Sequence, residues 1–110
     1  MKDMASLDDR EKGFESRFKL DEELKFKATA RRNKLLGLWA ADLMGLSETE
    51  AQSYAQEVVK SDFERPGDGD VLEKVHGDLV AKGLDTSEHI VRKHMDDLMG
   101  TAVEQIEAGE

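Results

Sequence analysis

The apolar residues of this chain recur at intervals of three, four and seven positions, the spacing of one face of an α-helix. No stretch alternates polar and apolar residues over the length of a β-strand. The strongest pattern predicts a helix over residues 21–44, in a segment with almost no β-branched residues and no proline. The apolar stripe predicted for this helix is Leu20, Leu24, Ala28, Leu35, Trp39 and Leu43.

Local signals predict where the first two helices end and begin. Gly45 is placed to end the first helix in the left-handed conformation. Ser47 and Glu50 have the spacing of a capping box, in which each side chain accepts a hydrogen bond from the other residue's backbone N–H, so a second helix is expected up to about residue 60. Gly37 interrupts the first helix at a cost of about 1 kcal/mol, unless another helix crosses closely there.

The second half of the chain predicts two more helices. Residues 66–69, with the sequence PGDG, interrupt the helical pattern and predict a turn. Asp70 and Glu73 form a possible second capping box, opening a helix that stops at Gly83, and a last helix begins near residues 86–87. The predicted inner faces of the three later helices are Ala51, Tyr54, Ala55, Val58 and Val59; then Val71, Leu72, Val75, Leu79 and Val80; then Ile90, Val91, His94, Met95, Leu98, Met99, Ala102, Val103 and Ile106. Four helices with short links predict an all-α, compact four-helix bundle, with Trp39 as a core anchor.

Composition narrows the class of protein. A length of 110 residues fits one domain, and the absence of cysteine excludes disulfides and thiolate metal sites. No apolar run approaches the roughly 20 residues of a membrane helix, and the first residues lack the apolar core of a secretory signal, so we expect a cytoplasmic protein. Residues 47–110 contain 6 basic and 16 acidic side chains, which disfavours nucleic acid as a partner.

The first residues form a separate segment. Met4, Leu7, Phe14 and Phe18 have a heptad-like spacing, but at 100° per residue their mean direction differs by roughly a quarter turn from that of the next helix's stripe. The segment is also short for an isolated helix. We therefore predict a flexible or marginally helical arm over residues 1–19 and a bundle over residues 20–110. The arm is either a further helix packed on the bundle or a helix that inserts into a groove of another protein, with Leu7, Phe14 and Phe18 as anchors.

Catalytic and metal sites find little support. His89 and His94 are five residues apart, which places them on different helix faces. Residues 62–73 have acids at several positions of a calcium loop, but Pro66 stands where an oxygen ligand belongs, and a helix stop, a turn and an N-cap explain the same residues. No nucleophile, phosphate-loop or dinucleotide motif is present, so we expect no enzymatic activity and no cofactor.

One basic cluster has two interpretations. Arg31, Arg32 and Lys34 could hold an anion such as the phosphates of ADP or ATP, as a regulatory ligand. Alternatively, these cations form salt bridges with the acidic helices around them. The first interpretation makes the protein a small helical nucleotide sensor.

Beyond these patterns, the sequence resembles the zeta subunit of alphaproteobacterial F-type ATP synthases over nearly its whole length. The residues that carry the resemblance are Asp8-Asp9-Arg10-Glu11, Phe14-Glu15, Phe18, Phe26-Lys27, Ala30-Arg31-Arg32-Asn33, Leu35-Leu36-Gly37, Trp39-Ala40-Ala41, Tyr54-Ala55, Asp62-Phe63, Pro66-Gly67-Asp68, Asp70-Val71 and Gln105-Ile106.

The resemblance implies a four-helix bundle that inhibits ATP hydrolysis by the synthase. Its N-terminal segment, residues 1–18 here, would fold into a helix as it enters a catalytic interface between alpha and beta subunits, near the gamma subunit of the rotary shaft, and leave synthesis largely free. We then expect a monomer when free, a cytoplasmic location in association with the membrane-bound synthase, and no membrane insertion. The contact residues that it implies are Leu7, Asp8, Asp9, Arg10, Glu11, Phe14, Glu15 and Phe18.

Overall fold

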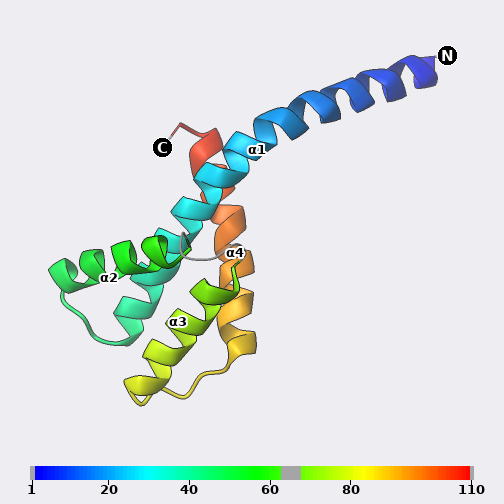
Figure 1. The fold of residues 1–110 in the computed structure, drawn as a ribbon. Helices are drawn as coiled ribbons and strands as arrows, with labels where there is room; N and C mark the ends of the chain where they lie inside the picture. Colours follow the sequence, from blue (N-terminus) through cyan, green and yellow to red (C-terminus); the bar gives the residue numbers. More distant parts are fainter. Residues whose placement is uncertain (1, 63–67, 110) are drawn as a thin grey trace.

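The computed structural model describes the backbone of residues 2–62 and 68–109, and the side chains of residues 22–62 and 68–109. Within these ranges the protein consists of four α-helices and no strand, which confirms the predicted all-α bundle (Figure 1). The helices are α1 (Lys2–Leu43), α2 (Glu48–Ser61), α3 (Gly69–Ala81) and α4 (Glu88–Glu107). α1 packs against each of the other three, and α3 also packs against α2 and α4.

Helix α1 is much longer than the sequence pattern predicts. It does not begin at Asp21 but runs without a break from Lys2, and its N-terminal part extends past the ends of the other helices (Figure 1). The molecule is therefore elongated, with extents of 61 × 27 × 23 Å. Residues 2–20 contain one glycine and no proline, and a single glycine costs about 1 kcal/mol, which is too little to end a helix that the bundle has already nucleated.

Most of the predicted helix ends are confirmed. Gly45 and Gly83 follow α1 and α3 with φ angles of +72° and +80°, the left-handed conformation that glycine adopts without strain. The capping box at the start of α2 is complete, because the Ser47 hydroxyl accepts from the Glu50 N–H at 3.1 Å and the Glu50 carboxylate accepts from the Ser47 N–H at 3.0 Å. Ser87 caps α4 with a single bond, because its hydroxyl accepts from the Ile90 N–H at 3.2 Å.

The capping box predicted at Asp70 and Glu73 is wrong. α3 begins at Gly69, so Asp70 lies inside the helix and Asp68 occupies the N-cap position. The Asp68 side chain makes no capping bond. Its carboxylate instead accepts a hydrogen bond from the Arg92 guanidinium of α4 at 2.6 Å, and a charged partner binds a carboxylate more strongly than a backbone N–H does.

The core lies where the four helices meet. Predicted inner residues of α2, α3 and α4 are buried or half-buried, with the exceptions of Val80 and Ile90, which are exposed. The fully or almost fully buried apolar side chains are Ala28, Leu36, Ala40, Ala41, Tyr54, Ala55, Val58, Val71, Val75, Leu79, Val91, Met95 and Ala102.

The predicted face of α1 is confirmed at Ala28, which is fully buried, but from residue 35 onward it is shifted by about one residue. Leu36 and Ala40 are buried, whereas Leu35 and Trp39 are only half-buried and Leu43 is 48% exposed. One residue corresponds to 100° of helix rotation. The quarter-turn offset between the arm and this helix rests in part on Leu35, which lies beside the buried face, and the boundary after residue 19 stays a prediction.

Small residues explain which face of α1 is buried. A Cβ atom built on Gly37 would lie 2.6 Å from the Ala55 Cα atom and 3.2 Å from a methyl of Val58. The backbones of α1 and α2 therefore meet at Gly37, and this close crossing accounts for a glycine inside the helix. Dispersion contacts grow as the backbones approach, so the small side chains of this face turn toward the partner helix.

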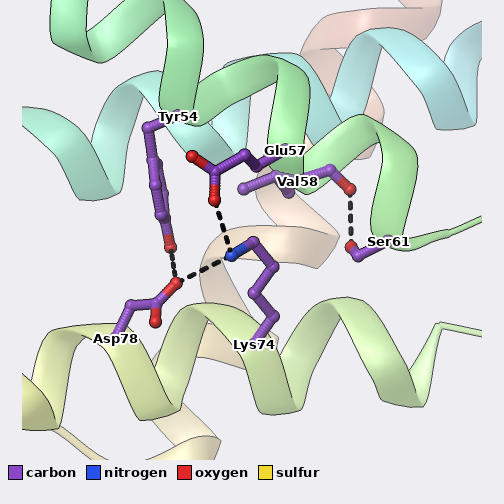
Figure 2. Close-up of polar contacts among 6 residues, drawn as sticks. All are labelled: Tyr54, Glu57, Val58, Ser61, Lys74 and Asp78. Atoms are coloured by element: carbon purple, nitrogen blue, oxygen red, sulfur yellow. Dashed lines mark hydrogen bonds and ion pairs between the residues drawn. The ribbon is translucent and has the colours of Figure 1, made fainter.

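A polar network joins α2 to α3 at the edge of this core (Figure 2). The Tyr54 hydroxyl donates to the Asp78 carboxylate at 2.8 Å, and burial raises the pKa of Tyr54 well above its usual value. The Lys74 ammonium lies between the two helices, 3.1 Å from Asp78 and 3.3 Å from Glu57. At the far end of α2, the Ser61 hydroxyl donates to the carbonyl of its own preceding turn. The Tyr54–Asp78 and Lys74–Glu57 bonds join the two helices and hold α3 against α2.

Candidate functional site

The predicted partner-binding residues all lie on the N-terminal part of α1. The backbone there is helical, but the side chains of Leu7, Asp8, Asp9, Arg10, Glu11, Phe14, Glu15 and Phe18 lie outside the described residues. Their contact role stays a prediction. Among the described side chains of α1, the first that is buried is Ala28, whereas Phe26 is 66% exposed.

The three cations of the predicted anion site have different environments. The Arg31 guanidinium donates to the Gln105 side chain of α4 at 2.9 Å. Arg32 is 5% exposed and donates through Nε to Asn33 at 2.9 Å, and its burial lowers its pKa. Lys34 is exposed. The binding of ADP or ATP by these residues stays a prediction.

Arg32 takes part in a charge cluster that joins three elements. The Asp68 carboxylate, at the start of α3, lies 2.6 Å from the Arg92 guanidinium of α4 and 3.9 Å from that of Arg32 on α1. The hydrogen bond from Arg92 holds the pKa of Asp68 below its usual range. Arg32 thus has the salt-bridging role that was the second interpretation of the basic cluster. No local pattern predicts this cluster, because its members are 24 or more positions apart.

A groove with basic walls lies where α1 passes the ends of α2 and α4, and sequence reasoning does not find it. One part, of about 640 Å³, is lined by Phe26, Lys27, Arg31 and Lys34 of α1 with Ile106 of α4. Val59 of α2 and Lys34 also line an adjoining part of about 340 Å³, which continues along α2 to Lys60. We call these two parts together the basic groove. Its cations are Lys27, Arg31, Lys34 and Lys60.

Histidines and acids form no metal centre in the described part of the chain. His94 stacks on Trp39 with ring centroids 4.1 Å apart, which is a packing contact at the edge of the core. Across the described side chains, no three His, Cys, Asp or Glu residues are grouped so as to hold a metal ion. Residues 63–67 of the calcium-like loop lie outside the described residues. Over the part that is described, no helix is long and apolar enough to cross a membrane.

Comparisons with known proteins identify the family of this chain. The family model for ATPase inhibitor subunit zeta matches residues 4–105. A structure solved by NMR in solution is 48% identical, with a TM-score of 0.70, over 79% of this chain and 99% of the other. No curated protein gives a significant match. The family is regulatory rather than enzymatic. Because the model matches from the N-terminal part of α1 to nearly the end of α4, the chain belongs to the ATPase inhibitor subunit zeta family.

Proposed function

We propose that this protein inhibits ATP hydrolysis by F-type ATP synthase by inserting residues 1–18, as a helix, into a catalytic interface between an alpha and a beta subunit near the gamma subunit. Membership of an ATPase inhibitor family supports the inhibitory role. The observation that carries the insertion is the extension of α1 beyond the bundle (Figure 1). At 1.5 Å per residue, residues 2–19 span about 27 Å, enough to reach deep into a subunit interface.

Continuity with the bundle favours a helical arm. An isolated helix of this length is marginal in water, chiefly because the first turn is costly to form. Here the part of α1 that packs in the bundle, where Ala28, Leu36 and Ala40 are buried, is already helical and serves as the nucleus. Each residue of the arm therefore only extends an existing helix. The arm therefore loses less conformational entropy on binding than a free peptide would, and more of the contact energy is available for affinity.

We assign different roles in partner binding to the apolar and the charged side chains of the arm. Leu7, Phe14 and Phe18 supply apolar and aromatic groups of the kind that dominate binding energy when they fill hollows in a partner. Asp8, Asp9, Glu11 and Glu15 are acidic and Arg10 among them is basic, and charges of both signs set the register and the orientation of a bound helix.

The test is ATP turnover by the detached catalytic head of the synthase. The full chain should suppress hydrolysis, and deletion of residues 1–18 should abolish the effect. The deletion leaves in place every described buried residue, since these lie between Ala28 and Ala102, and circular dichroism of the truncated protein should show an intact helical bundle. Equal inhibition by the truncated protein would refute the proposal.

Point variants test the anchors within the full chain. Phe14→Ala and Phe18→Ala should each weaken inhibition by about tenfold or more, as expected for anchor residues. Leu43→Ala is the matched control, because Leu43 is an exposed apolar residue at the opposite end of α1. Loss of inhibition in the control to the same degree would show that the effect is not specific to the arm.

A further inference from the structure

The basic groove stands out against the charge of the rest of the protein. The chain has 25 acidic and 16 basic residues, with a net charge of −9. Nevertheless, among the residues that the structure describes, the groove is lined by four cations and by no acidic side chain. Lys27 and Lys34 are exposed, and neither makes an ion pair with another described residue. Exposed positive charge at Lys27 and Lys34, on a protein that is acidic as a whole, forms a surface suited to an acidic partner.

The groove also offers apolar surface. Phe26 lies at one end of the groove and is 66% exposed, although removal of a phenyl ring from water is energetically favourable. Val59 of α2 and Ile106 of α4 line the same groove and are half-buried. Apolar surface bordered by polar groups is the usual composition of a protein–protein interface.

The arrangement of the cations favours an extended acidic segment over a compact phosphate ligand. Lys27, Arg31 and Lys34 are spaced by four and three residues, so they form one stripe along about 10 Å of α1, and Lys60 of α2 lengthens it. A nucleotide's phosphates need donors that converge on one point. Carboxylates spaced along a peptide match a row of separated cations.

We propose that the basic groove binds an acidic segment, carrying at least one apolar side chain, of the synthase's catalytic head. This inference rests on the proposed function, which brings the head to the arm. Phe26 follows Phe18 by eight residues, about 12 Å along α1, so a partner that holds the arm is adjacent to the groove. The groove would then be a second contact that adds to the affinity of the arm, while the arm alone blocks hydrolysis.

The test compares two doubly charge-reversed full-length variants in the ATPase assay. Lys27→Glu with Lys34→Glu should raise the half-inhibitory concentration by about tenfold at low salt, leave the maximal inhibition unchanged, and differ less from wild type as salt increases. The control, Lys82→Glu with Lys93→Glu, makes the same change in net charge at exposed positions of the acidic body and should stay within about twofold of wild type.

Phe26→Ala tests the apolar half of the groove. Because the side chain is exposed, its truncation should leave the thermal unfolding midpoint unchanged while it weakens inhibition in the same manner as charge reversal. Wild-type half-inhibitory concentrations for both the charge-reversed and the Phe26 variant would overturn the groove proposal and leave the proposed function intact. If nucleotide alone also shifted the NMR signals of Lys27 and Lys34, the groove would be a nucleotide site instead.

Crosslinking tests, independently of inhibition, which segment of the head lies against the basic groove. The chain has no cysteine, so Gln56→Cys, at an exposed position that lines the groove, accepts a single photoactivatable group. It should capture an Asp- and Glu-rich segment of the head, whereas His89→Cys, exposed on α4, should not. A wild-type chain that binds the head and gives this adduct without inhibiting hydrolysis would contradict the proposed function alone. Failure of the wild-type chain to bind the head would overturn both proposals.

Discussion

Substitution of Gly37 by alanine tests the closest approach in the bundle. In an open helix, alanine is more favourable than glycine by about 1 kcal/mol. At Gly37, however, the new Cβ atom would lie 2.6 Å from the Ala55 Cα atom, where carbon atoms normally approach to about 3.5–4.0 Å. Since a backbone atom cannot rotate away, α2 must move outward by about 1 Å, at a cost of about 3 kcal/mol. The net loss in the free energy of unfolding is therefore about 2 kcal/mol.

Urea unfolding followed by circular dichroism measures this difference. With an m-value of about 2 kcal/mol/M, the midpoint for Gly37→Ala should fall by about 1 M. Gly77 of α3 and Gly100 of α4 are matched controls, because a Cβ atom at either would meet nothing within 4 Å. Alanine at each should stabilise the protein by about 0.5–1 kcal/mol. A rise in the midpoint of Gly37→Ala equal to that of the controls would refute the close crossing of α1 and α2.

Two further substitutions test the polar contacts between helices. Tyr54→Phe removes the hydrogen bond to Asp78 and should lower the free energy of unfolding by about 1–2 kcal/mol at neutral pH, measured by the same urea titration; no change would show that the bond contributes nothing. Asp68→Asn removes the ion pair with Arg92. Because the pKa of Asp68 is lower in the folded than in the unfolded chain, the ion pair stabilises the protein fully above about pH 4 and is lost as the pH falls through the folded pKa. The advantage of wild type over Asp68→Asn should thus disappear at low pH, and a difference independent of pH would contradict this origin.

The charge cluster at Asp68 and the basic groove show two uses of cations on α1. Arg32 is buried and paired, so its charge helps to hold α1, α3 and α4 together. Lys27 and Lys34, two turns apart on the same helix, remain exposed to solvent. Arg32 and Lys34, two residues apart in one basic cluster, therefore have different environments because they occupy different faces of the helix. Substitutions at Arg32 should be interpreted as changes in folding before they are interpreted as changes in binding.

Helix ends are predicted well wherever the signal is local. The left-handed glycines at 45 and 83 and the Ser47–Glu50 box lie within a turn of the ends that they determine, and all are confirmed. The start of α1 is predicted wrongly, because the amphipathic pattern of an isolated segment does not report a helix that is nucleated elsewhere and then extended. The residues of the candidate partner contact come from resemblance to a family, and the family is confirmed while the contacts remain a prediction.

The sequence by itself determined the all-helical class of the fold, the number of helices and most of their caps. Each of these depends on the periodicity and backbone preferences of residues a few positions apart. Only the tertiary structure decided which face of α1 is buried, how Asp68 joins three helices, and where α1, α2 and α4 line the open basic groove. Such features join residues that are distant in the chain. They depend on how closely helices approach, and Gly37 shows that the approach is governed by the smallest residue rather than by the largest apolar ones.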